Sequence, residues 1–457
     1  MNINELNSMN PEERAKTLYE MTPEMYKSFL ELDGSDQVQF SKIFTHVHTD
    51  MGSPMDAILT IPQYIETAKK MGTKYLTVTD HGTMYGVQTL YDECKSNDLE
   101  LIIGVEFYVC DDDVTNNKLK HTRLHLVGYA KDKQGYLTLS RLVTESNYRI
   151  ITVGKQDFPC ISRDLLMKYM GPGTEGHGHV ILTSACIGGV LTGITFEQET
   201  LRRNIEKLLE IYSNNKRDYD MAMYAQAQID KLEEMKASTS DKDEKAQITA
   251  AIKSFKANIS ACNTTMNAYK NQGVYTLDDF AKYLEKSAAQ IEQLKSEEIP
   301  AENIEEEMKK AAEWYDACAG HGNFYIEIQY HGISTEQKYE HLICGIAHEL
   351  NVPLISGIDA HMQNKEDARS RKYINALRFS QFDPVEPADE ELYLKTDGDL
   401  YRWLKKAVVP GDALEAMDNR MRLAEQCHVV LEKENHYPIY PMNKDEEALA
   451  ASIPDMF

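Results

Sequence analysis

The stretch Ile43-Phe44-Thr45-His46-Val47-His48 joins a short apolar run to two histidines that stand one residue apart. Side chains one residue apart on a strand point to opposite faces, unless the strand is ending and the backbone bends. At such an end both imidazoles can turn toward a single ion. The stretch therefore predicts a β-strand whose carboxyl end carries metal ligands.

Further residues with metal-binding side chains lie just after or within other β-like runs. They are Asp80-His81, Glu106, His125, Cys186 and Asp359-Ala360-His361. In a barrel of β-strands and helices the carboxyl ends of the strands form one rim, and that rim carries the chemistry. Each motif is weak when taken singly, because a histidine at a strand end is often only a hydrogen-bonded core residue. Together they predict a metal site at one rim.

Seven short β-like runs, with helix-like stretches between the first of them, predict a parallel α/β barrel. The runs are residues 43–47, 75–79, 101–105, 124–129, 180–183, 324–329 and 353–356, and helices are expected at 61–71 and 86–96.

A long interruption with a different period separates the fifth run from the sixth. Its apolar residues advance by alternating steps of four and three, which is typical of a coiled-coil seam. The clearest series is Ile248, Ile252, Phe255, Ile259, Cys262, Met266 and Tyr269. We expect a large inserted helical bundle or coiled-coil arm, which either packs on itself with solvated acidic faces or binds a partner.

The expected organisation has four parts. They are an N-terminal helical appendage at 1–40, a barrel at 41–194 and 321–440, the inserted helical arm at 195–320, and a C-terminal tail at 441–457.

Composition limits the classes of function. The 457 residues include 73 acids and 49 bases, a formal net charge of -24, so strong unaided binding to DNA phosphates is not expected. Bound metal ions can still reverse the potential locally and admit a phosphate ester. No apolar run approaches the ~20 residues of a membrane span. The polar, acidic start and the eight scattered cysteines favour a cytoplasmic protein that does not contact a membrane.

Three longer motifs resemble the PHP (polymerase and histidinol phosphatase) domain. They are Phe44–Thr49, Gly104–Val109 and, the most specific of them, Thr79-Asp80-His81-Gly82-Thr83-Met84-Tyr85-Gly86. The variety they resemble most is the N-terminal PHP domain of the bacterial DNA polymerase III alpha subunit. The resemblance implies a distorted seven-stranded (β/α)7 barrel of PHP type with a trinuclear metal site.

Nine residues match the ligand positions of that family. They are His46, His48, Asp56, His81, Glu106, His125, Cys186, Asp359 and His361. The resemblance implies that one ion takes His46, His48, Glu106 and Asp359, that a second shares Glu106 and takes His125 and Cys186, and that a third takes Asp56, His81 and His361. Imidazole, carboxylate and thiolate together suit zinc, manganese or iron.

Two of these assignments have alternatives or departures. Asp56 stands one residue farther from His48 than in the commonest polymerase version. Cys186 is best interpreted as a thiolate ligand, with a buried filler or a covalent nucleophile as alternatives. The expected nucleophile is hydroxide generated on two to three divalent ions, so no protein nucleophile is required.

Three functions remain open. The favoured one is a metal-dependent phosphoesterase, a 3'-5' exonuclease of the proofreading type, in a stand-alone PHP subunit or fragment of an alpha-like replicase. Its expected partners are a DNA 3' end as substrate and a separate polymerase core or replication proteins bound through the arm. Because the sequence stops at Phe457, where a polymerase palm, thumb and fingers would follow, this chain is not expected to polymerise. The alternatives are a non-enzymatic, metal-stabilised replisome scaffold and a small-molecule phosphatase of the histidinol-phosphate type.

Overall fold

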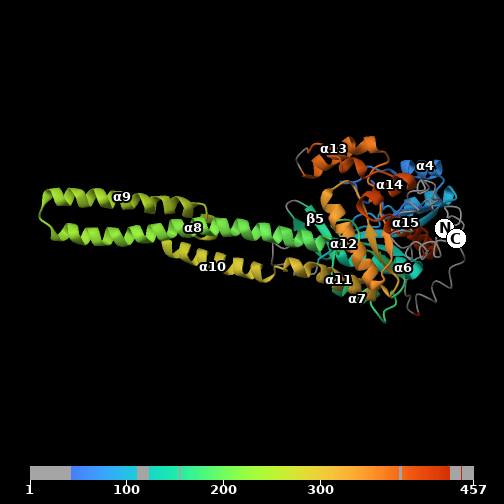
Figure 1. The fold of residues 1–457 in the computed structure, drawn as a ribbon, viewed down its shortest axis with the longest axis horizontal. Coiled ribbons are helices and arrows are strands. Elements are labelled where there is room, and N and C mark those ends of the chain that lie inside the picture. Colours follow the sequence, from blue (N-terminus) through green and yellow to red (C-terminus); the bar gives the residue numbers. More distant parts are fainter. Residues whose placement is uncertain (1–42, 111–122, 154–155, 380–382, 433–443, 445–457) are drawn as a thin grey trace.

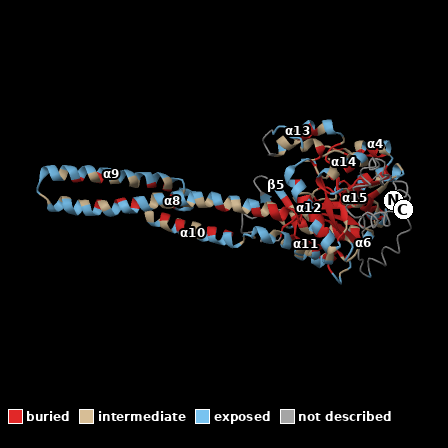
Figure 2. Ribbon diagram, viewed as in Figure 1, coloured by how far each residue is buried: buried red, intermediate tan, exposed pale blue. Residues whose placement is uncertain are grey.

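A mixed α/β body carries a long helical projection (Figure 1). The structure, a computed structural model, describes residues 43–110, 123–153, 156–379, 383–432 and 444. Buried residues concentrate in the body, whereas the projecting helices are mostly exposed (Figure 2). Across these ranges, no helix combines the length and the apolar character that a bilayer crossing requires. The predicted appendage at 1–40 lies outside the described residues, as does nearly all of the predicted tail.

The body is built on a sheet of eight strands within the described ranges. They are β1 (Tyr75–Val78), β2 (Glu100–Val109), β3 (Leu124–Ala130), β4 (Ile150–Val153), β5 (Gln156–Ile161), β6 (Val180–Thr183), β7 (Phe324–Ile328) and β8 (Leu354–Ser356). Their order is β4-β5-β2-β3-β6-β7-β8, and β1 also pairs with β2. The central strand β2 is buried on both faces, which explains its nearly continuous apolar sequence.

Two details of the sheet differ from the sequence prediction. Strand β3 runs antiparallel to both β2 and β6, so the prediction of a wholly parallel barrel is wrong. An antiparallel neighbour needs no crossover helix, and the sequence between β2 and β3 has no helical period. The β4–β5 hairpin was not predicted, because its short strands include Pro159, a residue that weakens a strand pattern.

The segment that carries the two leading histidines lies between β1 and the residues that follow β8. Ile43 forms an isolated parallel bridge with Tyr75, and Val47 forms another with Ala360. The backbone amide of His48 also donates to the carbonyl oxygen of Ala360 at 2.8 Å. The segment 43–48 therefore makes backbone contacts with β1 on one side and with the residues after β8 on the other.

Helices cover the sheet. Those of the body are α4 (Ile61–Met71), α5 (Val87–Ser96), α6 (Lys133–Ser146), α7 (Arg163–Met170), α12 (Ser334–Leu350), α13 (Ala368–Phe379), α14 (Asp397–Ala407) and α15 (Pro410–Gln426). Helix α4 has the predicted bounds because Thr60 and Gln63 form a capping box at its start and Gly72, with φ 68°, ends it. Helix α15 lies against β8, where the Asn419 side chain donates to the oxygen of Leu354 at 2.8 Å.

The projection consists of α8 (Gly193–Ser238), α9 (Lys242–Asn267) and α10 (Leu277–Ser296). Helices α8 and α9 lie side by side as a hairpin (Figure 1), and the Asp241 side chain caps α9. The α9 residues Ile248 and Ile252 are buried with Ile229 of α8, at the spacing that the seam predicts. Apolar burial therefore holds the hairpin together.

A helix and an ion pair connect the projection to the body. Helix α11 (Ile304–Ala319) packs against α7, β6 and β7 and buries Met308 and Tyr315 in the main core, although it lies inside the range 195–320. Arg202 near the start of α8 pairs with Glu298 at 2.7 Å, close to the end of α10. The boundaries of the four parts stay a prediction.

Candidate metal centre

The backbone is bent at three places where the predicted ligands lie. His46, Ala185 and Asp359 adopt positive φ angles of 59°, 60° and 46°. Such angles are uncommon for residues other than glycine and persist only where the surrounding structure holds them. The bend at His46 allows both leading histidines to face one carboxylate: the Nε2 atoms of His46 and His48 lie 3.4 and 3.1 Å from Asp359 Oδ1.

Glu106 connects this first group to a second. Its Oε1 lies 3.4 Å from His46 Nε2, and its Oε2 lies 3.4 Å from His48 Nε2. His125 Nδ1 is 2.8 Å from Glu106 Oε1 and 3.5 Å from the sulfur of Cys186. The ligand atoms of Glu106, His125 and Cys186 all lie within 4.8 Å of one another, as do those of His46, His48 and Asp359.

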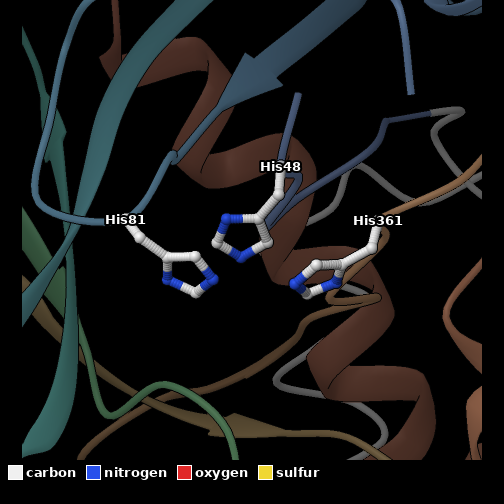
Figure 3. Close-up of side chains that lie close together, drawn as sticks. All are labelled: His48, His81 and His361. Atoms are coloured by element: carbon white, nitrogen blue, oxygen red, sulfur yellow. The ribbon is translucent and has the colours of Figure 1, made fainter. Parts of the chain in front are cut away.

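A third group brings three imidazoles together (Figure 3). His48, His81 and His361 offer nitrogens within 4.8 Å of one another, and the rings of His48 and His81 stack at 4.1 Å. Asp56 Oδ2 lies 3.3 Å from His81 Nε2 and 3.6 Å from His361 Nε2. All nine predicted residues thus lie in one connected cluster, with His48 between the first and third groups.

The cluster contains buried polar atoms that have no hydrogen-bond partner among the described residues. They are His46 Nε2, both ring nitrogens of His48 and of His81, both carboxylate oxygens of Glu106, and Asp359 Oδ1. Several of these atoms lie close together but are not oriented for hydrogen bonds. Buried polar atoms without partners cost free energy, so a group that supplies the missing contacts is expected. Nitrogen and carboxylate oxygen are both ligands for a divalent transition metal, so the residues fit such ions.

Known proteins resemble this chain in the same region. Residues 45–222 match the family model described as PHP domain. This region is a PHP domain. The match includes all the predicted ligands except Asp359 and His361, which the fold brings to the cluster from beyond β8.

Relatives of this chain include the DNA polymerase III alpha subunits of Campylobacter jejuni and Helicobacter pylori. The first is 22% identical over 86% of this chain and 24% of its own length; the second is 33% identical over 33% of this chain and 12% of its own. The chain thus spans about a quarter, 24%, of the first relative's length. A solved structure from Bifidobacterium adolescentis, described provisionally as a metal-dependent phosphoesterase, is 14% identical, covers 70% of this chain and 87% of its own, and has a TM-score of 0.24, too low to support the fold.

Electrostatics within the cluster follow from burial and mutual contact. Burial lowers the pKa of His48 to about 3, and the neighbouring His81 and His361 add to this effect. Burial alone would raise the pKa of Glu106, but the surrounding imidazoles of His125, His81 and His46 hold it well below its usual range. The His48 ring is therefore neutral and Glu106 is charged at neutral pH, which are the forms that bind a cation.

Glu327 on β7 is a functional candidate that the sequence analysis missed. Its Oε1 lies 2.6 Å from His46 Nδ1, and its other oxygen accepts from the Thr183 hydroxyl. A side chain on Gly357 would place its Cβ 1.8 Å from the Glu327 carboxylate, so only glycine leaves room there. A carboxylate on the far nitrogen of a ligand histidine fixes the orientation of its ring. Only a charged residue within an otherwise apolar strand signals this role in the sequence.

Asp56 is also held from behind, by α13. The Arg371 side chain donates to Asp56 Oδ1 and, at 2.8 Å, to its backbone oxygen, and Arg378 Nη1 lies 3.4 Å from Asp56 Oδ2. Asp80, the carboxylate before His81, accepts from the Thr49 amide at 2.7 Å and does not take part in the cluster. Arg371 and Asp80 therefore position the loops that carry the predicted ligands.

Proposed function

We propose that this chain is a metal-dependent phosphoesterase whose favoured substrate is the 3' end of a DNA strand. The observation that carries the proposal is the set of buried, unpartnered nitrogen and carboxylate atoms on His46, His48, His81, Glu106 and Asp359. The nine clustered residues would hold two to three divalent ions, zinc, manganese or iron, in the three groups described above. The PHP domain in which most of them lie supports this assignment.

We also propose that the sheet closes into a distorted barrel of seven strands. The contacts of segment 43–48 with Tyr75 on one side and Ala360 on the other support closure between β1 and β8. The ring would then run through this segment, β1, β2, β3, β6, β7 and β8, with β4 and β5 outside it. Its carboxyl rim would carry the cluster.

When bound, the ions would activate water and offset negative charge on the phosphoryl oxygens during an in-line displacement. The residues of the chain have defined tasks around them. Glu327 holds the His46 ring so that Nε2 faces the cluster, and Arg371 leaves Asp56 Oδ2 directed at His81 and His361. No side chain is required as a nucleophile, and Cys186 would act as a ligand.

The substrate follows from the relatives and from the charge of the chain. The alpha subunits it resembles are named as DNA polymerases, which favours a nucleic-acid end over a small phosphomonoester. With a net charge of -24 the chain has little general attraction for a DNA backbone. A single strand end, held mainly at the centre itself, suits such a surface best. Replication proteins that the arm would contact are proposed partners.

The test compares three substrates with the purified full chain after its metal content is measured. These are a primer labelled at its 3' end, the same primer labelled at its 5' end, and p-nitrophenyl phosphate. We expect two to three transition-metal ions per chain, early release of the 3' label, and progressive shortening of the 5'-labelled strand. Faster turnover of the phosphomonoester than of the primer would indicate the small-molecule phosphatase instead.

A variant distinguishes enzyme from scaffold. His46→Ala is expected to abolish primer degradation while the helical signal in circular dichroism is retained. Wild-type protein that carries its metal ions and hydrolyses none of the three substrates would contradict the enzyme and leave the scaffold. Protein purified without depletion that holds no transition metal would contradict both.

A further inference from the structure

A hollow extends from the candidate centre toward the β4–β5 hairpin and α13. Its volume is ≈ 360 Å³, and its lining includes Asp56, His81, Tyr108, Phe158 and Arg378. Two of these residues belong to the cluster and the others do not. The hollow therefore joins the centre to a surface that the chemistry described so far does not use.

Two arginines lie near the ring of Phe158, and one of them, Arg378, also lines the hollow. The guanidinium carbon of Arg123 lies 3.7 Å from the ring centroid, and that of Arg378 lies 5.9 Å from it. A guanidinium stacks favourably on an aromatic face, which fixes its orientation. The two arginines come from different parts of the chain, one preceding β3 and the other on α13. Tertiary folding is thus needed to bring the pair together.

One nitrogen of the Arg123 guanidinium is buried at a cost in free energy. Its Nη1 atom is buried without a hydrogen-bond partner in the part of the chain that the structure describes. Burial lowers its pKa, and repulsion by Arg378 adds to this effect. Asp157, the acid on the rim of the hollow, is exposed and accepts from the Thr152 hydroxyl at 2.6 Å. An anion that contacts both guanidinium groups would remove the cost.

We propose that Arg123 and Arg378, oriented by Phe158, bind the phosphate adjacent to the scissile one in a nucleic-acid strand. This inference rests on the proposed phosphoesterase function and specifies its substrate class. Successive phosphates of a strand are one nucleotide apart, so with one at the centre the next would lie in the hollow against Arg378, beside the Phe158 ring on which Arg123 stacks. Guanidinium groups bind phosphate oxygens in a two-pronged geometry. The site therefore selects substrates with at least two phosphates over mononucleotides.

The direct test is binding, measured by the anisotropy of a fluorescein-labelled, single-stranded phosphorothioate oligonucleotide across a range of salt concentrations. Arg123→Gln is expected to raise Kd about tenfold, since a hydrogen bond to a charged group is worth on the order of a factor of ten. The slope of log K against log salt should fall by about 0.7 for each phosphate group that the variant no longer neutralises. Arg203→Gln, an exposed arginine on α8, is the matched control and should change neither quantity.

A kinetic ratio and a competition complete the test. The kcat/KM for the oligonucleotide, divided by that for bis-(p-nitrophenyl) phosphate, which has one phosphate, should fall about tenfold in Arg123→Gln. A dinucleotide with two phosphates should displace the oligonucleotide better than a mononucleotide or inorganic phosphate, and Arg123→Gln should narrow that difference. Arg378→Gln is a second variant, and metal content is measured for both because Arg378 also contacts Asp56. If Arg378→Gln loses metal, the conclusion is drawn from Arg123→Gln alone.

Separate outcomes identify which proposal fails. Unchanged affinity, salt slope and kinetic ratio in a folded Arg123→Gln would overturn the arginine subsite while ester hydrolysis stands. Equal displacement by mononucleotide and dinucleotide would also overturn it and indicate a site for a single phosphate. Absence of all ester hydrolysis by metal-loaded protein would overturn the proposed function, and the anisotropy would still decide the binding of the strand.

Discussion

The candidate centre in the body and the seam of the arm bury opposite kinds of side chain. In the body, the candidate centre buries imidazole and carboxylate groups with unpartnered atoms, supported by contacts such as that of His46 with Glu327, 281 residues away. In the arm, most buried positions hold apolar residues such as Ile252 and Phe280, and most residues overall are exposed (Figure 2). The arm is organised for its own stability, whereas the body gives up stability to assemble a site.

The difference between the two regions is tested most severely by removing the carboxylate shared by the first two groups of the cluster. Glu106→Gln is expected to lower phosphodiester hydrolysis by on the order of 10³-fold and to release metal. The reason is that it removes a charged ligand, and bound metal ions stabilise the transition state by several kcal/mol. The measurements are kcat/KM and metal content per chain. Glu100→Gln makes the same change at the exposed start of the same strand and should leave both near wild type. Equal losses in the two variants would mean that β2 is only structurally sensitive.

A change in the arm should affect the arm alone. Ile252→Ala removes a side chain buried between α8 and α9 and is expected to destabilise the hairpin by about 2 to 4 kcal/mol. Limited proteolysis should then cut within 206–296 at lower denaturant concentration, while metal content stays unchanged. Loss of metal in this variant would show that the two regions are coupled.

Replacing 206–296 by a short Gly–Ser linker, and measuring the binding of replication proteins, would separate a partner-binding arm from a self-packed one.

Glu327 sharpens the comparison inside the body. Glu327→Gln keeps the shape of the side chain but removes the charge that holds His46, so metal affinity or turnover should fall about 10- to 100-fold. Glu340→Gln is a suitable control, because Glu340 is buried on the neighbouring α12 and burial already raises the pKa of its carboxyl well above the usual range. A metal titration monitored by calorimetry distinguishes the two variants. Equal affinities in both would remove Glu327 from the site.

The smallest expected effect concerns the packing of α15 on β8. Burial raises the pKa of Glu415 to about 7, so the folded protein binds more protons than the unfolded chain between pH 4.5 and 7. Stability from this group is therefore fully present below pH 4.5 and is lost as pH rises toward 7. Glu415→Gln should raise the free energy of unfolding at pH 8 by about 2 kcal/mol relative to wild type and flatten its pH dependence. Denaturant melts at pH 5 and pH 8 measure this, and parallel curves for the two proteins would refute it.

Much of the body could be predicted from the sequence because its signals are local. The apolar runs before Asp80-His81 and Glu106 predicted β1 and β2, and helical spacing predicted α4 and α5. The strand predicted at 43–47 is wrong, because this segment forms only isolated bridges, at Ile43 and Val47. The gathering of the nine side chains was predicted from the order of the motifs and from resemblance, and their role as ligands stays a prediction. In the arm, the repeated steps of four and three predicted helices α9 and α10 in the same way.

The rest depends on partners that are distant along the chain. The hydrogen bonds from Arg371 to Asp56 join residues 315 positions apart, and no local sequence pattern predicts them. The antiparallel direction of β3 depends on how the chain returns after β2, which apolar periodicity does not encode. Arg123 and Arg378 likewise come together only because both lie near Phe158 of β5, although they are far apart in the sequence.

Arg202 and Glu298 pair where the chain leaves the body at the start of α8 and where it returns after α10, so the two crossings lie side by side. An insertion whose ends are adjacent can be lengthened, shortened or exchanged for another hairpin without altering the distance between β6 and β7. We therefore expect the length of the projection to vary among relatives far more than the residues at its base.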